Sequence, residues 1–430
     1  MKWTRICNWI AGFCWLTLAV PSAGAAIDGI PGPTFNLTAA ADTISMPDGG
    51  SVPVWGYGPE GSRSQYPGPT LIVNQGDTVT VALSSEIAVN GTPVPTSMLF
   101  PGQTGVTASG GSEGLLTRES TGPDDPVTYS FVARRPGTYM YHSGTRPDLQ
   151  VEMGLLGALI VRPSQGAGLA YNHADSRFDH EYLFLLTEMD PALHEQVAAG
   201  NLDGVDTSAY YPMYWFINGR AAPDTMAPAG ASWLPTQPYN AMIRTRPGDT
   251  MLMRIVGAGR DLHPFHHHGN NTRVIARDGR LLQSAPGAGA DLAYSEFTIK
   301  TVPGATYDAL FHWTGRKMGW DIYGDAPHEC NDGDGDDFDD STWEYCPDHG
   351  EPFPVQLPEA QELAFGGQYS GSPFLGTEGS LPPGEGGLNE YGGFFFMWHS
   401  HVEKEMTNFD VFPGGMMTMM VVEPPGTPIP

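Results

Sequence analysis

Residues 70–83 have the sequence TLIVNQGDTVTVAL, in which a turn at Asn74–Asp77 separates two short, largely apolar segments. After the turn, Thr78–Leu83 alternates between polar and apolar residues, as a half-buried strand does. A Gly-Asp turn followed by an alternating strand returns at Pro247–Val256. This weak internal repeat indicates two copies of one β-rich type of domain.

Further short strands, separated by turns, are expected along the chain. They fall at Val52–Trp55, Val127–Val132, Thr138–His142, Gly154–Arg162 and Tyr182–Glu188. The 55 glycines and 39 prolines imply many turns and few long helices, and 40% hydrophobic residues are ample for a core. Regularly spaced short strands predict an all-β protein built from β-sandwiches. Residues 190–205 are expected to form a short helix or a loop.

The first 25 residues have the pattern of a secretory signal peptide. Lys2 and Arg5 give a basic start, Ile10–Val20 is apolar, and Ala23–Ala25 offers a small-residue cleavage site. An uncleaved anchor is the alternative, although the apolar run is short for a membrane span. No later segment resembles a transmembrane helix, so we expect a soluble mature chain that is periplasmic or secreted.

The chain is strongly acidic, with a formal charge of −27. Removal of Lys2 and Arg5 with the signal leaves 19 basic residues against 48 acidic ones, a charge of −29. Such a chain is a poor partner for nucleic acid or an anionic membrane surface, whereas cations suit it.

Two histidine clusters are the strongest chemical signal. His399 and His401 lie in an apolar, aromatic segment, and His266 and His268 repeat the same spacing upstream. Residues i and i+2 of a strand point to the same face, so each pair presents two imidazoles together. Imidazole nitrogen suits copper, zinc, nickel and iron. A His-rich segment at 263–268 can also be a solvated turn, but flanking strands favour a built-in site.

Several segments resemble the multicopper oxidase family. Pro67–Val79 is similar to the family's opening strand pair, Gly137–Ser143 and Gly154–Val161 to the end of its first cupredoxin domain, and Tyr214–Arg220 to the entry of a further one. The resemblance implies two cupredoxin-like Greek-key β-sandwich domains. Their expected limits are 1–25 for the signal peptide, 26–165 for domain 1 and 166–430 for domain 2, with an acidic insertion at about 320–392.

The resemblance also assigns copper ligands in the first domain, where the family has two His-x-His pairs. Leu99 and Pro101 occupy the positions of the first pair. The second pair survives only as His142, because Gly144 replaces its partner. Half of the family's copper cluster is therefore missing from its usual positions.

In the second half, the resemblance implies that His263 is a ligand of the type 1 copper, His266 of the type 2 copper and His268 of the type 3 pair. His399 and His401 belong to the last ligand segment, and His267 falls on the opposite face.

Between His399 and His401 the family has cysteine, but this chain has Ser400. A blue type 1 site needs a cysteine thiolate, so this difference predicts that type 1 copper is absent. The downstream type 1 histidine is also missing. Met416 stands where the family has its methionine, and we favour core packing for it.

The insertion carries two further candidates. Cys330 and Cys346, the only cysteines outside the signal, predict a disulfide in an oxidising compartment, with a thiolate ligand as the alternative. Asp332, Asp334 and Asp336 offer closely spaced oxygens that suit calcium. Glu344 falls one place too late to complete an EF-hand, so a solvated acidic loop is the other interpretation.

The sequence thus predicts an exported copper protein, an oxidoreductase with a histidine-ligated copper centre that lacks type 1 copper. A small molecule or a metal ion would be its substrate, with dioxygen as the acceptor. The alternatives are a non-catalytic protein for copper storage, resistance or delivery, and a scaffold whose histidines are structural. The resemblance also allows a homotrimer.

Overall fold

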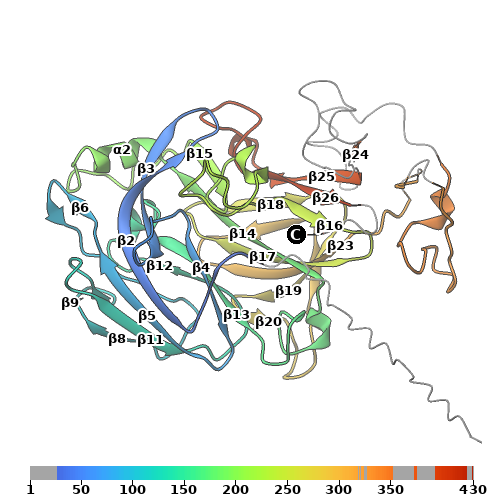
Figure 1. Ribbon diagram of the computed structural model, residues 1–430, viewed down its shortest axis with the longest axis horizontal. Coiled ribbons are helices and arrows are strands. Elements are labelled where there is room, and N and C mark those ends of the chain that lie inside the picture. The colour runs from blue at the N-terminus through green and yellow to red at the C-terminus, as the bar shows by residue number, and fades with distance from the viewer. Residues whose placement is uncertain are drawn as a thin grey trace, which may run out of the picture.

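The fold is all-β, as a computed structural model shows (Figure 1). The structure describes residues 27–317, 319, 321–323, 327–351, 372–374, 393–423 and 429. The predicted signal peptide lies outside these residues. Within the described part of the chain, no helix is long and apolar enough to cross a membrane.

The first β-sandwich is formed by two sheets from the N-terminal part of the chain. One sheet has the order β1 (Ile30–Pro31), β4 (Gly68–Asn74), β13 (Leu156–Arg162), β12 (Gly137–His142). The other has the order β3 (Ser51–Pro59), β2 (Thr34–Ser45), β5 (Thr78–Ser85), β11 (Val127–Val132), β8 (Thr107–Gly110). Two small hairpins pair β6 (Ala88–Val89) with β7 (Thr92–Pro93) and β9 (Ser112–Glu113) with β10 (Arg118–Glu119). As the alternation in β5 predicts, every second side chain enters the core.

The second β-sandwich follows the same plan. One sheet runs β15 (Tyr214–Ile217), β14 (His180–Met189), β17 (Thr250–Gly257), β23 (Thr306–His312), β19 (Thr272–Arg277), β20 (Arg280–Leu281), and β21 (Tyr294–Glu296) pairs with β19. The other runs β16 (Ile243–Thr245), β26 (Met417–Val422), β25 (Gly393–Ser400), β18 (His263–His267), β22 (Thr298–Thr301), and β24 (Ser372–Phe374) pairs with β25. Phe184, Phe265 and Trp398 pack between these sheets.

Helices are few and short. The described residues form two α-helices, α1 (Pro147–Gln150) and α2 (Pro191–Ala198). They also form four short 3-10 helices, at Ala174–Ser176, Asp224–Met226, Cys346–Asp348 and Glu403–Met406. α2 lies in the segment for which a helix or a loop was expected. The Asp190 side chain accepts hydrogen bonds from the N–H groups of Ala192 and Leu193, which caps this helix.

A buried polar network links the two sandwiches. Arg254 of β17 donates to Glu181 at 2.9 Å and to Thr138 of β12 at 3.0 Å. Thr138 in turn donates to Asp308 of β23 at 2.5 Å. Because Arg254 is fully buried, these partners compensate a charge that would otherwise be costly to remove from water.

The predicted all-β fold with two sandwiches is confirmed. The Cys330–Cys346 disulfide is also present, so neither cysteine supplies a thiolate ligand. The domain limits at residues 165 and 166, and the limits of the insertion, stay predictions.

Candidate metal centre

The pairing of β18 with β25 brings the two histidine segments together. The strands are antiparallel, with His266 opposite His399, Phe265 opposite Ser400 and His267 opposite Trp398. Because side chains alternate along a strand, His266 and His399 leave one face of the sheet. Phe265 and Trp398 enter the sandwich core on the other face.

Four imidazoles form a group on the outer face, which we call the histidine cluster: His266, His268, His399 and His401. The ring centre of His266 lies 4.8 Å from that of His268, 5.4 Å from that of His399 and 5.0 Å from that of His401. The Nε2 atoms of His268 and His399 are 3.3 Å apart. His268 and His399 are fully buried, whereas His401 is exposed, so the cluster reaches solvent on one side.

Hydrogen bonds orient two of the rings. Nδ1–H of His399 donates to the Ser400 carbonyl oxygen at 2.7 Å, which leaves the lone pair of His399 on Nε2. Nδ1 of His266 lies 2.8 Å from the Thr298 hydroxyl on β22. Partners of this kind fix ring orientation and tautomer in metal sites. In both rings Nδ1 has a partner outside the cluster, and Nε2 of His399 faces Nε2 of His268.

Two rings of the cluster, His266 and His399, are uncharged at neutral pH. Burial, and then the neighbouring His268 and His401, lower the pKa of His266 to about 4. Burial, and to a smaller extent the other rings, lower the pKa of His399 to about 3, although its hydrogen bond to the Ser400 carbonyl opposes this. Metals bind the neutral form of imidazole, so the apoprotein already holds these side chains in the ligating state.

His267 lies on the opposite face, as expected. Its ring packs against Phe311 and Trp398 and is hydrogen-bonded to Thr272. Burial lowers the pKa of His267 to about 3, which suits a neutral core residue.

His263 does not have the surroundings of a type 1 ligand, which corrects the role that the resemblance gave it. Its Nε2 lies 2.8 Å from Glu188 and its Nδ1 2.9 Å from Glu405. Ser400 also donates to Glu405, at 2.5 Å. We call these four buried residues the carboxylate–imidazole network. Since both ring nitrogens already donate to carboxylates, His263 has no lone pair left for a metal.

The network holds a cation without a metal ion. Burial opposes protonation of His263, but hydrogen bonds to Glu188 and Glu405 outweigh it and raise the pKa of His263 to about 9. Glu188 is further held by the backbone N–H groups of Arg260 at 2.5 Å and Asp261 at 2.9 Å. At the position of His263 the chain therefore has an imidazolium between two carboxylates.

Sequence reasoning missed Glu188 and Glu405. Ser400 in place of cysteine was the available signal, because a buried histidine that loses its metal needs new partners. Met416 is fully buried in the core of the second sandwich, so the expected packing role fits.

His142 is the first sandwich's counterpart of His399. Leu99 forms a bridge with His142, as His266 pairs with His399. Nδ1–H of His142 also donates to the following carbonyl, that of Ser143, at 2.9 Å. His142 lies on β12, however, and is not among the three histidines whose ring nitrogens lie within 4.8 Å of one another.

Leu99 fills the space of the missing ligands in the first sandwich. A Cβ atom added to Gly144 would lie 2.8 Å from Cγ of Leu99. A side chain at position 144 would therefore displace Leu99. Leucine at position 99 and glycine at position 144 are thus sterically compatible with each other.

The predicted calcium ligands Asp332, Asp334 and Asp336 do lie together, with carboxylate oxygens within 4.8 Å of one another. Asp332 accepts hydrogen bonds from the backbone N–H groups of Gly335 and Asp336. Calcium binding there stays a prediction.

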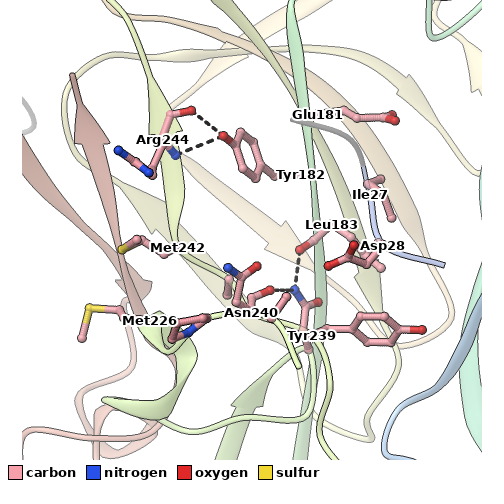
Figure 2. A pocket seen from close by; sticks show the side chains of 14 residues that line it. Ile27, Asp28, Glu181, Tyr182, Leu183, Met226, Tyr239, Asn240, Met242 and Arg244 are labelled. Carbon is pink, nitrogen blue, oxygen red and sulfur yellow. Dashed lines mark hydrogen bonds between the residues drawn. The ribbon is translucent and has the colours of Figure 1, made fainter. Parts of the chain in front are cut away.

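A cavity of about 420 Å³ lies elsewhere, beside the start of β14 (Figure 2). Figure 2 shows the Tyr182 hydroxyl accepting from the Arg244 N–H. The side chain of Asn218 donates to the Leu183 carbonyl. None of the predicted metal ligands lines this cavity, so the metal chemistry is not expected there.

Comparison with known proteins agrees with the fold. The family model described as multicopper oxidase matches residues 28–166. L-ascorbate oxidase of Brassica rapa subsp. pekinensis is 30% identical over 165 residues, which are 37% of this chain and 26% of that protein. The iron transport multicopper oxidase fetC of Epichloe festucae is 25% identical over 54% of this chain and 33% of its own length. Copper-containing nitrite reductase of Neisseria meningitidis serogroup B is 30% identical over 56% of this chain and 54% of its own length.

Solved structures share the fold across most of the chain. Blue copper oxidase from Nitrosomonas europaea has a TM-score of 0.54 and 19% identity, covering 90% of this chain and 85% of that one. Multicopper oxidase mgLAC also has a TM-score of 0.54 and 19% identity, covering 92% and 87%.

The paired β-sandwiches have the cupredoxin-like fold of these multicopper oxidase structures. Residues 28–166 of this chain match the multicopper oxidase family, and the chain spans only about a quarter to a third of the ascorbate oxidase and iron transport oxidase that it matches. Copper is the cofactor of that family.

Proposed function

We propose that this protein binds copper at the histidine cluster and acts as an oxidoreductase without type 1 copper. The observation that carries the proposal is the convergence of His266, His268, His399 and His401 across the β18–β25 pair. The donor set fits the metal, because neutral imidazoles with Nε2 directed by hydrogen bonds are good copper ligands.

Bound copper would supply one-electron redox chemistry, with a small-molecule or metal-ion reductant as substrate and dioxygen as acceptor. The protein's own contribution is to hold the imidazoles neutral and close together. His401 gives the cluster an exposed edge, so a small reductant can approach the ligands directly. This route matters because Ser400 and the carboxylate–imidazole network leave no thiolate site to accept electrons first.

Copper storage, resistance or delivery without turnover is the second candidate. It is favoured by the loss of ligands at Leu99, Pro101 and Gly144, since fewer ligands hold fewer copper ions. We also propose that the protein is exported to the periplasm or secreted, which the Cys330–Cys346 disulfide supports. A homotrimer stays a prediction.

The test is copper loading of the mature chain, followed by metal analysis, optical spectroscopy and oxygen-uptake measurements with a phenol, Cu(I), Fe(II) or Mn(II). We expect bound copper and no intense band near about 600 nm, because that band needs a thiolate ligand. His266→Ala and His399→Ala should each abolish copper binding. His173→Ala is the matched control, because His173 lies in a turn outside the cluster.

Oxygen uptake supports the oxidoreductase. Stoichiometric copper without uptake overturns it in favour of the storage protein. Copper binding that survives both cluster substitutions overturns the site itself.

A further inference from the structure

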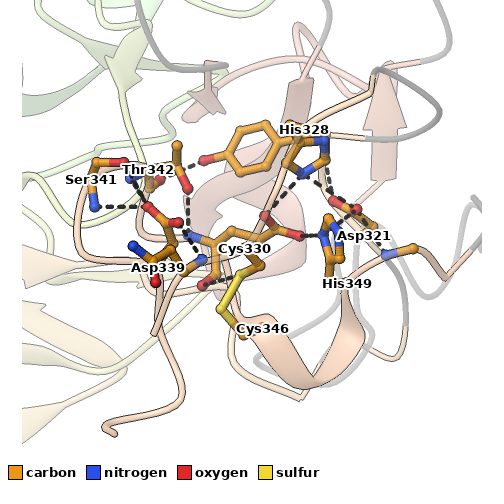
Figure 3. A network of polar contacts seen from close by, with 12 residues as sticks. Asp321, His328, Cys330, Asp339, Ser341, Thr342, Cys346 and His349 are labelled. Carbon is orange, nitrogen blue, oxygen red and sulfur yellow. Dashed lines mark hydrogen bonds and ion pairs between the residues drawn. A yellow bond between two sulfur atoms is a disulfide. The ribbon is translucent and has the colours of Figure 1, made fainter. Parts of the chain in front are cut away.

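A second group of metal-ligating side chains lies in the insertion, outside the proposed copper centre. We call it the insertion cluster: Asp321, His328, Glu344 and His349. One ligand atom from each lies within 4.8 Å of all the others. Figure 3 shows Asp321, His328 and His349 converging beside the Cys330–Cys346 disulfide. The cluster mixes two imidazoles with two carboxylates, unlike the neighbouring all-carboxylate group at 332–336.

The four side chains face one point. Glu344 places one oxygen 2.9 Å from Nε2 of His328 and the other 2.8 Å from Nδ1 of His349. Oδ2 of Asp321 lies 3.6 Å from the same nitrogen of His328 and 3.5 Å from that of His349. The two rings stand edge to face, 4.8 Å apart. Two nitrogens and two carboxylate groups therefore surround a common centre.

Burial makes the carboxylates of this cluster unusual. The side chains of Asp321 and Glu344 are each only 1% exposed, whereas those of His328 and His349 are 22% and 33% exposed. Among the described residues, the two histidines are the only cationic groups paired with these carboxylates. Two buried carboxylates carry negative charge that is costly to hold away from water unless a cation compensates it. A divalent cation would neutralise both carboxylates.

The loop is braced to hold this arrangement. Cys330 follows His328 by two residues and Cys346 follows Glu344 by two residues, so the disulfide ties together the two segments that carry these ligands. Asp339 accepts hydrogen bonds from the N–H groups of Asn331 and Thr342, each at 2.7 Å. A cross-linked, capped loop loses less conformational entropy when it binds a metal.

We propose that the insertion cluster is a zinc site, with His328, His349, Asp321 and Glu344 as its four ligands. Structural zinc takes four ligands, and imidazole nitrogen and carboxylate oxygen are both in its repertoire. Calcium prefers six to eight oxygens, which a site with two nitrogens does not offer. The zinc ion would fasten the insertion to the residues that follow β23, independently of the copper centre.

The experiment uses the full mature chain carrying His266→Ala and His399→Ala, so that zinc cannot occupy the histidine cluster. After chelation, the protein is titrated with zinc alone by calorimetry and metal analysis. We expect one zinc ion per chain, with X-ray absorption showing a shell of nitrogen and oxygen atoms at about 2.0 Å and no sulfur.

Glu344→Gln and His349→Ala should each weaken zinc binding at least 100-fold. Asp334→Asn is the matched control, because Asp334 lies in the same loop outside the cluster. Circular dichroism and disulfide content should be unchanged in all three, which separates lost ligation from lost folding. In a chain with the histidine cluster intact, Glu344→Gln should still bind copper, so the two proposals fail separately.

Three results would overturn the zinc site. They are no zinc retained above buffer, equal losses in Asp334→Asn and Glu344→Gln, or calcium bound at the cluster in preference to zinc. The first of these would leave the cluster as a hydrogen-bonded network only.

Discussion

At the scale of single residues, Ser400 is where this chain departs most clearly from a blue copper protein. Its hydroxyl donates to Glu405, which also accepts from His263. The change from cysteine is therefore accompanied by a complete set of new partners. A single Ser400→Cys substitution would place a thiol beside a His263 that is protonated and bound to two carboxylates.

We accordingly predict that Ser400→Cys does not create a blue copper site. The new thiol would lack both of its usual histidine partners, because His263 is held by two carboxylates and no second histidine follows. Copper loading followed by optical spectroscopy checks this, and no intense band near about 600 nm should appear. A strong band there would mean that His263 is free to ligate.

The carboxylate–imidazole network should make stability depend on pH. The pKa of His263 is about 9 in the folded protein, against about 6.5 for an exposed histidine. Since the folded state holds the proton more tightly, the stabilisation is complete below about pH 6.5 and is lost as pH rises through about 9. The contribution is up to about 3 kcal/mol.

Urea unfolding at pH 6, 7.5 and 9 measures this effect. Glu405→Gln removes one of the two carboxylates that raise the pKa of His263, so it should flatten the pH dependence. An equally steep loss of stability in this variant would assign the effect to other groups.

At the scale of secondary structure, β22 contacts the histidine cluster through its pairing with β18. Thr298 of β22 lies opposite His266, and its hydroxyl is 2.8 Å from Nδ1 of that ring. Such partners orient a ligand without touching the metal. The neighbouring strand is thus part of the centre although it supplies no ligand.

Thr298→Val should therefore lower copper affinity by about 10- to 100-fold with little change in stability, since the shape is retained and only the hydroxyl is lost. Competition titration with a copper chelator measures the affinity. Thr298→Ser, which restores the hydroxyl, should recover it. If the serine variant binds as weakly as the valine variant, orientation by the hydroxyl is not the cause.

At the scale of the whole molecule, Arg254 joins the two sandwiches through Glu181, Thr138 and Asp308. Arg254→Met should leave Asp308 buried without its cation, although Glu181 keeps its pair with Arg162, at a cost of about 3–5 kcal/mol. Thermal unfolding measures this. Arg63→Ala is the control, because Arg63 is largely exposed in its pair with Asp42 and should contribute about 0–1 kcal/mol. Equal effects of the two substitutions would contradict a special role for the interface.

How much of this molecule was predictable follows from the range of its interactions. The strands around residues 70–83 and the shared face of His399 and His401 depend on neighbours in sequence, so periodicity indicates them. The disulfide follows from having just two cysteines outside the signal. The carboxylate partners of His263 could not be predicted in this way. Glu188 and Glu405 lie 75 and 142 positions from His263, and no local pattern predicts such pairing. Asp321 and Glu344 escape for the same reason.

The match between the Leu99–His142 bridge and the His266–His399 pair has a wider consequence. Both halves of the chain have one backbone arrangement for presenting side chains, but the second half presents two paired imidazoles where the first presents Leu99 and His142. Gain or loss of metal capacity in this architecture thus requires exchanges at a few positions and no rebuilding of strands. A lineage can then vary its number of redox centres while the scaffold that carries them stays constant.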